Sequence, residues 1–248
     1  MELKEFFSQN GRIALAFSGG VDSAYLLYAA VTAGADVKAY YVKSAFQPEF
    51  ELRDAQRLAE ELGAQMEVIP LDLLCDETIA ANPADRCYHC KKRIFTAIAN
   101  AAARDGYSVL MDGTNASDDA ADRPGIRALQ EMQVRSPLRE CGITKVQVRQ
   151  LSREAGLFTW DKPAYACLAT RIPTGERITP DKLTRTEQAE TLLEQMGFRD
   201  FRVRLMGEDA KLQLRQEQLP VLMERRCELL EQLKPLYRNI LLDLEVRQ

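Results

Sequence analysis

The sequence lacks any long apolar segment, since none of its 248 residues lies in a hydrophobic run near the roughly 18 residues that span a bilayer. Residues 1–5 are acidic and have no apolar centre of the kind found in signal peptides. Internal repeats and low-complexity segments are also missing. We therefore expect a cytoplasmic protein that has no membrane partner.

A large excess of charge of one sign is missing too. The chain has 33 basic and 37 acidic residues, and this net charge of −4 argues against a surface built to bind nucleic acid. Hydrophobic residues make up 46% of the chain and charged residues 28%, which is typical of an ordinary globular protein. The length allows a substantial core, either in one large domain or in a domain with a smaller companion.

The six cysteines are expected to be reduced thiols, because disulfides are rare in the cytoplasm. Cys87 and Cys90 form a CxxC at the start of a predicted helix, but no second CxxC or HxxxH completes a zinc site. Four interpretations stay open. The pair is a redox pair, half of a zinc site, two buried thiols, or, together with Cys167, the ligand set of an iron–sulfur cluster with one open iron.

Cys167 lies in segment 160–175, which has little periodicity and is typical of a long ordered loop that carries function. A nucleophilic or sulfur-carrying thiolate needs positive charge beside it, and Lys162 and Arg171 can supply that charge. The remaining cysteines lie in or beside helical patterns and are expected to pack in the interior: Cys75, Cys141 and Cys227.

Strands and helices alternate along the first half of the chain. The patterns predict strands at 12–17, 37–42, 65–70 and 109–111, and helices at 48–62, 86–104 and 145–155. Strands separated by helices favour a parallel sheet that is covered on both faces. The fold class predicted for this part is therefore α/β.

The pattern changes after Gly156 and predicts a smaller α+β domain. Helices are expected at 180–196 and 219–233, and strands at 199–206, 210–215 and 240–244. Arg202 and Arg204 alternate on the first of these strands, so their guanidinium groups share one face, where they suit a phosphate or a carboxylate. The alternative is a solvated strand face with ion pairs.

Residues 18–23, with the sequence SGGVDS, connect the first strand to an apolar helix. Backbone N–H groups in a glycine turn and at an open helix N-terminus form a cradle for an anion. Ser18 and Ser23 add hydroxyl donors, and Asp22 can cap the helix or hold a cation. The segment is not a Walker A loop, because no Gly-Lys-Ser/Thr follows it.

A second polar turn, Asp112-Gly113-Thr114-Asn115, follows the fourth strand and is expected at the same edge of the sheet. Taken alone, it is a turn with an Asx cap. Asp118 and Asp119 come next and are candidate Mg²⁺ ligands, or acids that complement a helix dipole.

The SGGVDS segment resembles the signature of the PP-loop ATP pyrophosphatases. Further segments resemble the LarE family of ATP-dependent sulfur transferases of nickel-pincer nucleotide synthesis: 85–92, 112–115 with Asp118 and Asp119, 123–125, 135–138, 161–173 and the Arg202/Arg204 pair. The resemblance implies a PP-loop (adenine nucleotide alpha hydrolase-like) domain at 1–170. It also implies a smaller C-terminal α+β domain at 171–248 for substrate binding and oligomerisation.

The resemblance further implies that ATP is cleaved between its α and β phosphates with Mg²⁺. AMP is then placed on a carboxylate of pyridinium-3,5-biscarboxylic acid mononucleotide, which becomes a thiocarboxylate. The implied nucleotide-binding residues are Ser18, Gly19, Gly20, Asp22, Ser23, Gly113, Thr114 and Asn115. The implied catalytic residues are Cys167, Asp22 and Arg171, and the implied substrate-binding residues are Arg202 and Arg204.

The sulfur source has two versions within the resemblance. Cys87, Cys90 and Cys167 match variants that hold a 4Fe–4S cluster with an additional sulfide, whereas in the single-cysteine form the residue matching Cys167 gives up its own sulfur. The alternatives outside the family are a PP-loop tRNA thiolase and a nucleotide sensor. A homo-oligomer and contacts with other nickel-pincer pathway enzymes are expected from the family.

Overall fold

The structure is a computed structural model that describes residues 2–118 and 124–247, and the chain divides into two compact units. Unit 1 consists of Met1–Leu73 and Asp85–Lys162, and unit 2 consists of Leu74–Ala84 and Pro163–Gln248. The last change of unit comes after Lys162, whereas the family resemblance implies a domain boundary after residue 170. The short segment Leu74–Ala84 belongs to the C-terminal unit. No helix among the described residues is long and apolar enough to cross a bilayer.

Unit 1 is built around a parallel sheet with the strand order β3-β2-β1-β4. Its strands are β1 (Ile13–Ala16), β2 (Val37–Lys43), β3 (Gln65–Pro70) and β4 (Val109–Met111). Its helices are α1 (Leu3–Gln9), α2 (Val21–Thr32), α3 (Glu49–Glu61), α5 (Arg86–Arg104), α6 (Pro124–Glu131), α7 (Pro137–Glu140) and α8 (Lys145–Glu154). The parallel sheet confirms the predicted α/β class.

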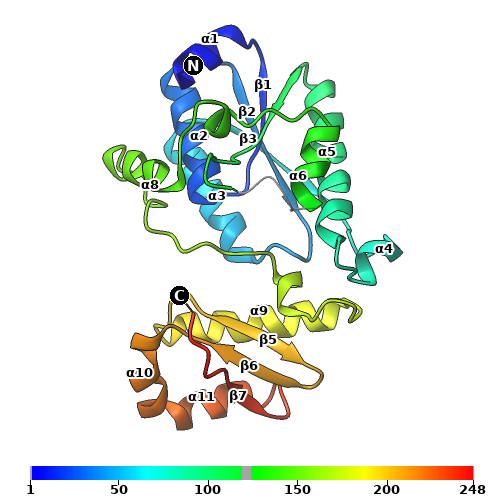
Figure 1. The fold of residues 1–248 in the computed structure, drawn as a ribbon, viewed down its shortest axis with the longest axis vertical. Helices are drawn as coiled ribbons and strands as arrows, with labels where there is room; N and C mark the ends of the chain where they lie inside the picture. Colours follow the sequence, from blue (N-terminus) through cyan, green and yellow to red (C-terminus); the bar gives the residue numbers. More distant parts are fainter. Residues whose placement is uncertain (1, 119–123, 248) are drawn as a thin grey trace. The chain divides into compact units, whose positions relative to one another are not determined.

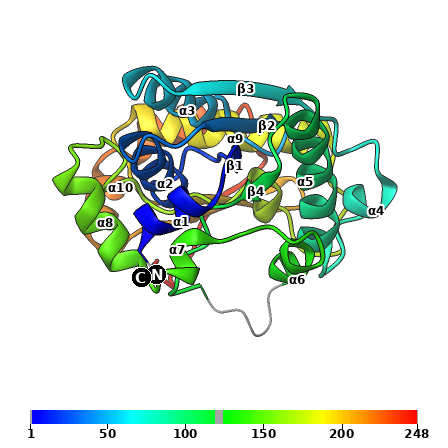
Figure 2. The ribbon, with the colours of Figure 1, turned by 90° about the horizontal axis from the view of Figure 1, so that it is seen from above.

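Alternate strand residues supply the two faces of this sheet. Ile13 and Leu15 pack into a large cluster with α2 and α3, whereas Ala14 packs with Tyr40 against α5. Figure 1 shows α2 and α3 on one side of the strands and α5 on the other, and Figure 2 shows the same layers from above. The sheet is therefore covered on both faces, as the uninterrupted apolar strands predict.

The ends of the parallel strands place the SGGVDS loop. Parallel pairing of Leu15 with Met111 aligns β1 with β4, so the chain leaves both strands at the same edge. The segment that follows β1 is the loop to α2, and the segment that follows β4 is the turn from Asp112. The topology thus brings together two segments that are far apart in the sequence.

Residues at the other edge form an ion-pair network between β2 and the end of α5. The Tyr40 hydroxyl donates to Asp105 at 2.8 Å, and the Lys38 ammonium contacts Asp105 and donates to Glu67 at 2.7 Å. Arg104 donates to Asp105 and to Glu67 as well. The hydrogen bonds from Lys38, Tyr40 and Arg104 hold the pKa of Asp105 well below its usual range.

Unit 2 has a three-stranded sheet with the order β5-β6-β7, in which β5 and β6 are antiparallel and β6 and β7 are parallel. Its strands are β5 (Arg202–Met206), β6 (Asp209–Gln213) and β7 (Ile240–Leu242). Its helices are α4 (Glu77–Ala80), η1 (Leu168–Arg171), α9 (Pro180–Gln195), η2 (Gln216–Gln218), α10 (Leu219–Glu224) and α11 (Arg226–Leu233). This small sheet with helices confirms the predicted α+β region.

One predicted helix of unit 2 is divided. The pattern predicts a single helix at 219–233, but the structure has α10 and α11 with a break at Arg225, whose φ is −96° and ψ is 16°. The Arg225 guanidinium donates to the Met196 carbonyl at the end of α9 and to Glu228. These contacts hold Arg225 in a conformation that interrupts the helix.

The segment from Leu74 belongs to unit 2 through hydrogen bonds with residues that follow η1. Asn82 adopts a φ of 56°, and its side chain donates to the Pro173 carbonyl at 2.8 Å. The N–H groups of Gly175 and Ile178 donate to the carbonyls of Asn82 and Ala80, each at 2.8 Å.

Asp105→Asn is expected to make stability less sensitive to acid. A depressed carboxyl pKa adds stability that is fully present above the unfolded-state pKa of about 3.9 and is lost as the pH falls toward the folded-state pKa. Urea unfolding between pH 6 and pH 3 should therefore show that the gap in unfolding free energy between wild type and Asp105→Asn narrows with acid. Asp161→Asn, at an exposed carboxylate, is the matched control, and a gap that stays constant contradicts the role of Asp105.

Candidate active site

The loop from β1 to α2 is held by its own two hydroxyl groups. The Oγ atoms of Ser18 and Ser23 lie 3.0 Å apart, and Ser23 Oγ also donates to the Gly20 carbonyl at 3.1 Å. Gly20 is the N-cap residue of α2, and no described side chain caps the helix there. The first N–H groups of α2 thus retain their capacity to donate to an anion, and the helix dipole favours negative charge at that point.

Gly19 is required by the shape of this loop. Its φ is +72°, a backbone conformation that residues other than glycine adopt only with strain. A Cβ added at Gly19 would lie 3.1 Å from Ala55 Cβ and 3.3 Å from the Glu51 carbonyl oxygen, both on α3. The loop therefore passes against α3 with no room for a side chain.

The turn after β4 comes into backbone contact with the start of α2. A Cβ added at Gly113 would lie 2.8 Å from the backbone nitrogen of Ser23 and 3.2 Å from the carbonyl carbon of Asp22. Asn115 Nδ2 in turn donates to Asp22 Oδ1 at 3.3 Å. The two motifs, distant in the sequence, thus form one site.

Asp112 organises this turn from the inside. Its buried carboxylate accepts hydrogen bonds from the Thr114 N–H at 3.2 Å, the Thr114 hydroxyl at 2.5 Å and the Ser136 hydroxyl at 2.7 Å. These donors take up most of the roughly four acceptor positions of one carboxylate, so Asp112 holds the turn together. Ser136 belongs to segment 135–138, so this hydrogen bond ties that segment to the turn beside the SGGVDS loop.

Of the two candidate magnesium ligands, Asp118 has a structural contact in the same turn. Its Oδ2 accepts from the Asn115 N–H at 3.0 Å, and its carbonyl accepts from Arg139. Asp119 lies outside the described residues, as does Arg123. Among the described residues, Asp22 supplies the carboxylate in the first turn of α2.

The sequence analysis did not identify Lys145, the first residue of α8. Its Nζ lies 2.5 Å from Asp22 Oδ2 and forms an ion pair with that carboxylate. The two residues are 123 positions apart and Lys145 belongs to no motif, so no local signal could have paired them.

Cys87 and Cys90 both lie near the start of α5. Cys87 is exposed and Cys90 is buried, and the spacing of three places them on the same side of the helix. The Arg86 guanidinium donates to Cys87 Sγ at 3.8 Å. Among residues 2–118 and 124–247, no group of three His, Cys, Asp or Glu side chains is arranged to hold a metal ion.

Cys167 is the N-cap residue of η1 in unit 2 and is half-buried. Its carbonyl accepts hydrogen bonds from the Thr170 N–H at 2.9 Å and the Thr170 hydroxyl at 2.8 Å. Lys162, which was expected to supply positive charge, belongs to unit 1, where it pairs with Asp54 at 2.7 Å and lies over the Phe50 ring.

A buried ion pair lies beneath the Cys167 loop. Arg171 is 1% exposed and forms a bidentate pair with Glu190 of α9, at 2.7 Å and 3.0 Å. Arg171 also donates to the Ala166 carbonyl at 3.1 Å, and Glu190 accepts from the Tyr165 hydroxyl at 2.6 Å. Arg171 thus holds the residues on both sides of Cys167.

Arg202 and Arg204 also bind the backbone of this loop. Arg202 is buried and donates to the carbonyls of Ala164 and Phe201, whereas Arg204 is half-buried and donates to the Thr170 carbonyl at 2.9 Å. Burial, together with the positive charges of Arg171 and Arg247, lowers the pKa of Arg202 to about 10 and lowers that of Arg204.

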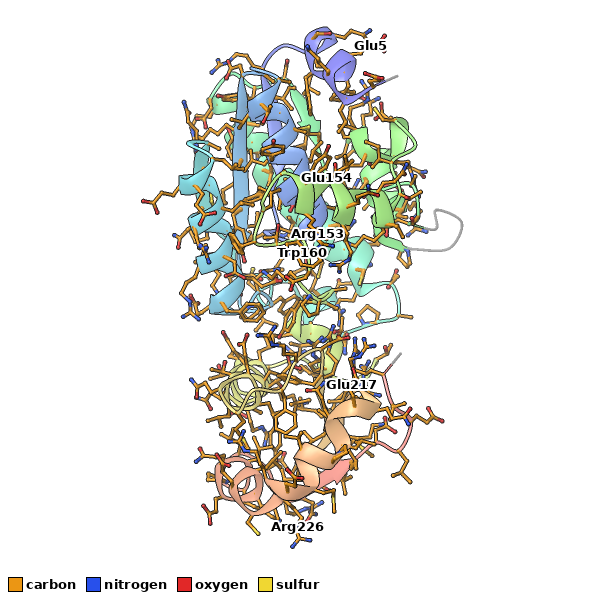
Figure 3. The ribbon with its side chains drawn as sticks, turned by 90° about the vertical axis from the view of Figure 1, so that its left-hand side faces the viewer. Glu5, Arg153, Glu154, Trp160, Glu217 and Arg226 are labelled. Atoms are coloured by element: carbon orange, nitrogen blue, oxygen red, sulfur yellow. The ribbon has the colours of Figure 1, made fainter. Side chains whose placement is uncertain are left out.

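Aromatic contacts stabilise the end of unit 1 before the chain enters unit 2. Figure 3 labels Arg153 and Trp160, and the Arg153 guanidinium lies 5.1 Å from the centre of the Trp160 ring. Arg149 donates to the carbonyls of Trp160 and Lys162 at 2.7 Å and 2.9 Å. Helix α8, which carries Lys145, thus also fixes the last residues of unit 1.

Known proteins resemble this chain over most of its length. The family model for queuosine biosynthesis protein QueC matches residues 12–84. An uncharacterized protein of Synechocystis sp. is 39% identical over 88% of this chain and 81% of its own length. A tRNA-specific 2-thiouridylase of Frankia alni is 29% identical over 77% of this chain and 67% of its own.

A pyridinium-3,5-bisthiocarboxylic acid mononucleotide synthase of Lactiplantibacillus plantarum is 34% identical over 94% of this chain and 86% of its own length. The chain belongs to the LarE family of PP-loop sulfur transferases. This finding confirms the family resemblance and the enzyme class. The roles of the individual LarE-family site residues stay predictions.

Gly113→Ala is expected to abolish nucleotide binding by this LarE-family chain while leaving a folded protein. The added methyl group meets the backbone of Ser23 and Asp22, so the start of α2 must move away from the turn. Equilibrium binding of α,β-methylene-ATP measures the loss. Gly11→Ala is the control, because a Cβ at Gly11 meets nothing within 4 Å, and normal nucleotide binding by Gly113→Ala would contradict the close approach.

Glu190→Ala is expected to destabilise the protein by about 3–5 kcal/mol, because it leaves Arg171 charged and buried without its partner. Thermal unfolding monitored by circular dichroism gives the comparison. Glu217→Ala, which removes the exposed partner of Arg215 in the same unit, should lower the unfolding temperature far less, because an exposed ion pair contributes little. Equal effects of the two substitutions would show that the buried pair has no special weight.

Proposed function

We propose that the chain is an ATP-dependent sulfur transferase that converts a carboxylate of pyridinium-3,5-biscarboxylic acid mononucleotide into a thiocarboxylate. The observation that carries the proposal is the 34% identity, over nearly the whole chain, to the synthase of the bisthiocarboxylic acid product. The SGGVDS loop, the Gly113 turn and the Cys167 loop supply groups that suit this reaction. We propose that the site binds a small-molecule nucleotide as its substrate.

The proposed reaction has two displacement steps. A substrate carboxylate oxygen attacks the α-phosphorus of ATP, and the bond from that phosphorus to the bridging oxygen breaks, so pyrophosphate leaves and an acyl-adenylate forms. A sulfur nucleophile then attacks the carbonyl carbon, the bond from that carbon to the AMP oxygen breaks, and AMP leaves with the electron pair. AMP transfer is needed because an unmodified carboxylate has no adequate leaving group.

We assign the triphosphate to the N-terminus of α2. Ser18, Gly19, Gly20 and Ser23 form the wall of the cradle, and the 113–115 turn closes it from the β4 side. Oriented N–H groups suit the negative charge that develops on the leaving pyrophosphate. Mg²⁺, when bound, neutralises part of that charge, and the Asp22 carboxylate suits it as an oxygen ligand.

We assign the substrate phosphate to Arg202 and Arg204. Both guanidinium groups come from β5 and lie beside the Cys167 loop, and the donors of a guanidinium group suit an anionic phosphate. Their contacts with the carbonyls of Ala164 and Thr170 would couple phosphate binding to the position of Cys167. Arg171 is proposed to act through the same loop, because its guanidinium is bound to Glu190.

We propose that Cys87, Cys90 and Cys167 hold a 4Fe–4S cluster. Two thiols on one side of α5 near its start suit two ligands of such a cluster, and the thiol of Cys167 would add the third. A bound cluster of this kind supplies inorganic sulfide as the sulfur nucleophile. The competing source is Cys167 itself: its thiolate forms the thioester, the Cα proton is removed, the Cβ–S bond breaks, and dehydroalanine remains.

Cys87→Ala is expected to remove iron and visible absorption from anaerobically purified protein. Wild type should be brown, with iron and sulfide measurable by chemical analysis, whereas Cys227→Ala, at an exposed thiol of unit 2, should match wild type. Colourless, iron-free wild type would overturn the cluster. In that case, intact mass after one turnover would test whether Cys167 has lost the elements of H₂S.

A tRNA thiolase is the second candidate, because tRNA-specific 2-thiouridylases are among the relatives. The net charge of −4 disfavours it, since phosphate contacts dominate binding to RNA. Incubation with ATP, a sulfur source and either substrate distinguishes the two candidate functions by mass spectrometry of the products.

We also propose that the protein is cytoplasmic, forms a homo-oligomer and contacts other enzymes of the nickel-pincer pathway.

A further inference from the structure

The ion pair between Lys145 and Asp22 lies inside the proposed nucleotide site. Asp22 is in the first turn of α2, where the triphosphate is proposed to bind, and its Oδ2 lies 2.5 Å from Lys145 Nζ. Asn115 occupies Oδ1 at 3.3 Å. The Lys145 ammonium group therefore balances the negative charge of the Asp22 carboxylate.

The backbone of Lys145 is fixed in that place. Thr144 and Gln147 form a capping box at the start of α8, and the Lys145 N–H donates to the Ser117 hydroxyl at 3.0 Å. The Ala116 N–H donates to the Ile143 carbonyl at 2.8 Å. Helix α8 thus starts directly against the 115–118 turn, and only the flexible side chain of Lys145 is free to change its direction.

Asp22 has two possible cations, the Lys145 ammonium and Mg²⁺. A hard divalent cation prefers a carboxylate oxygen, whereas an ammonium group binds a phosphate oxygen well as a compact charge with three donors. Once Asp22 turns to Mg²⁺, the Lys145 Nζ is left at the N-terminus of α2, beside the phosphates. Its four-carbon stem can reach a new acceptor without any movement of α8.

We propose that Lys145 is a polyphosphate-binding residue that exchanges Asp22 for the β or γ phosphate of ATP when the nucleotide binds with Mg²⁺. This inference rests on the proposed function, because it takes ATP as the ligand of this loop. It adds a residue to the leaving-group side of the site. AMP, which lacks those phosphates, does not engage Lys145.

The first test compares Lys145→Met with wild type by calorimetric titration of α,β-methylene-ATP in the presence of Mg²⁺. Methionine keeps much of the stem and removes the charge, so the dissociation constant should rise at least about tenfold, as expected for a lost hydrogen bond to a charged group. The dissociation constant for AMP should change less than about twofold. A uniform loss for both nucleotides would overturn the assignment to the polyphosphate.

Lys182→Met is the matched control. Lys182 also lies in the first turn of a helix with a threonine N-cap, and it pairs with Glu176 at 2.6 Å, but it belongs to unit 2. Its replacement should leave both dissociation constants unchanged. An effect on nucleotide binding equal to that of Lys145→Met would show that loss of a helix-start ion pair, rather than loss of a phosphate contact, is responsible.

The second test measures the coupling between the two residues without metal. In wild type, Lys145→Met leaves the Asp22 carboxylate unbalanced beside the phosphates, so a loss of metal-free binding there would not by itself identify a phosphate contact. In an Asp22→Asn background Lys145 is released, so the same substitution should weaken metal-free binding at least about fivefold. No loss in the Asp22→Asn background would overturn the exchange and leave a purely structural ion pair.

Failure of the inference is distinct from failure of the proposed function. If wild type binds α,β-methylene-ATP with Mg²⁺ and Lys145→Met binds it equally well, only the role of Lys145 is wrong. If wild type fails to bind the analogue although circular dichroism shows a folded protein, ATP is not the ligand and the proposed function is wrong as well.

Discussion

The site of unit 1 depends on one steric constraint, the contact between the backbone at Gly113 and the backbone at Ser23. Two parallel strands, β1 and β4, end at the same edge of the sheet, and only the missing side chain of Gly113 lets their loops touch. That contact allows Asn115 to reach Asp22 and places the start of α8 beside the same carboxylate. Polar groups from three parts of the chain therefore converge at the start of α2.

In unit 2, side chains hold the Cys167 loop in place. The Cys167 loop has little regular structure, so its backbone needs partners other than a helix or a sheet ladder. Arg171, Arg202 and Arg204 supply them by donating to its carbonyls, and Glu190 balances part of their charge from α9. The arginines are thus a scaffold for the loop.

The sequence allowed a correct prediction where local rules decide the structure. The strand, glycine turn and helix around SGGVDS follow from apolar periodicity and from the one conformation that only Gly19 adopts easily. The alternating faces of β1 and β2 follow in the same way.

The sequence failed where a distant group decides. The break at Arg225 is fixed by the Met196 carbonyl, and Lys145 is paired with a residue 123 positions away. Arg202 has the same alternation as an exposed strand residue, yet it is buried because the Ala164 carbonyl accepts its hydrogen bond. Hydrogen bonds across long separations leave no periodic signal in a single sequence.

The path of the chain between its two units limits how this protein can be dissected. The chain passes from unit 1 to unit 2 after Leu73, returns at Asp85 and leaves again after Lys162. A truncation at Lys162 would remove the residues that form hydrogen bonds with Asn82 and Ala80. Neither unit can therefore be separated from the other by a single cut in the chain. A chimera that takes unit 2 from a relative must replace both Leu74–Ala84 and Pro163–Gln248.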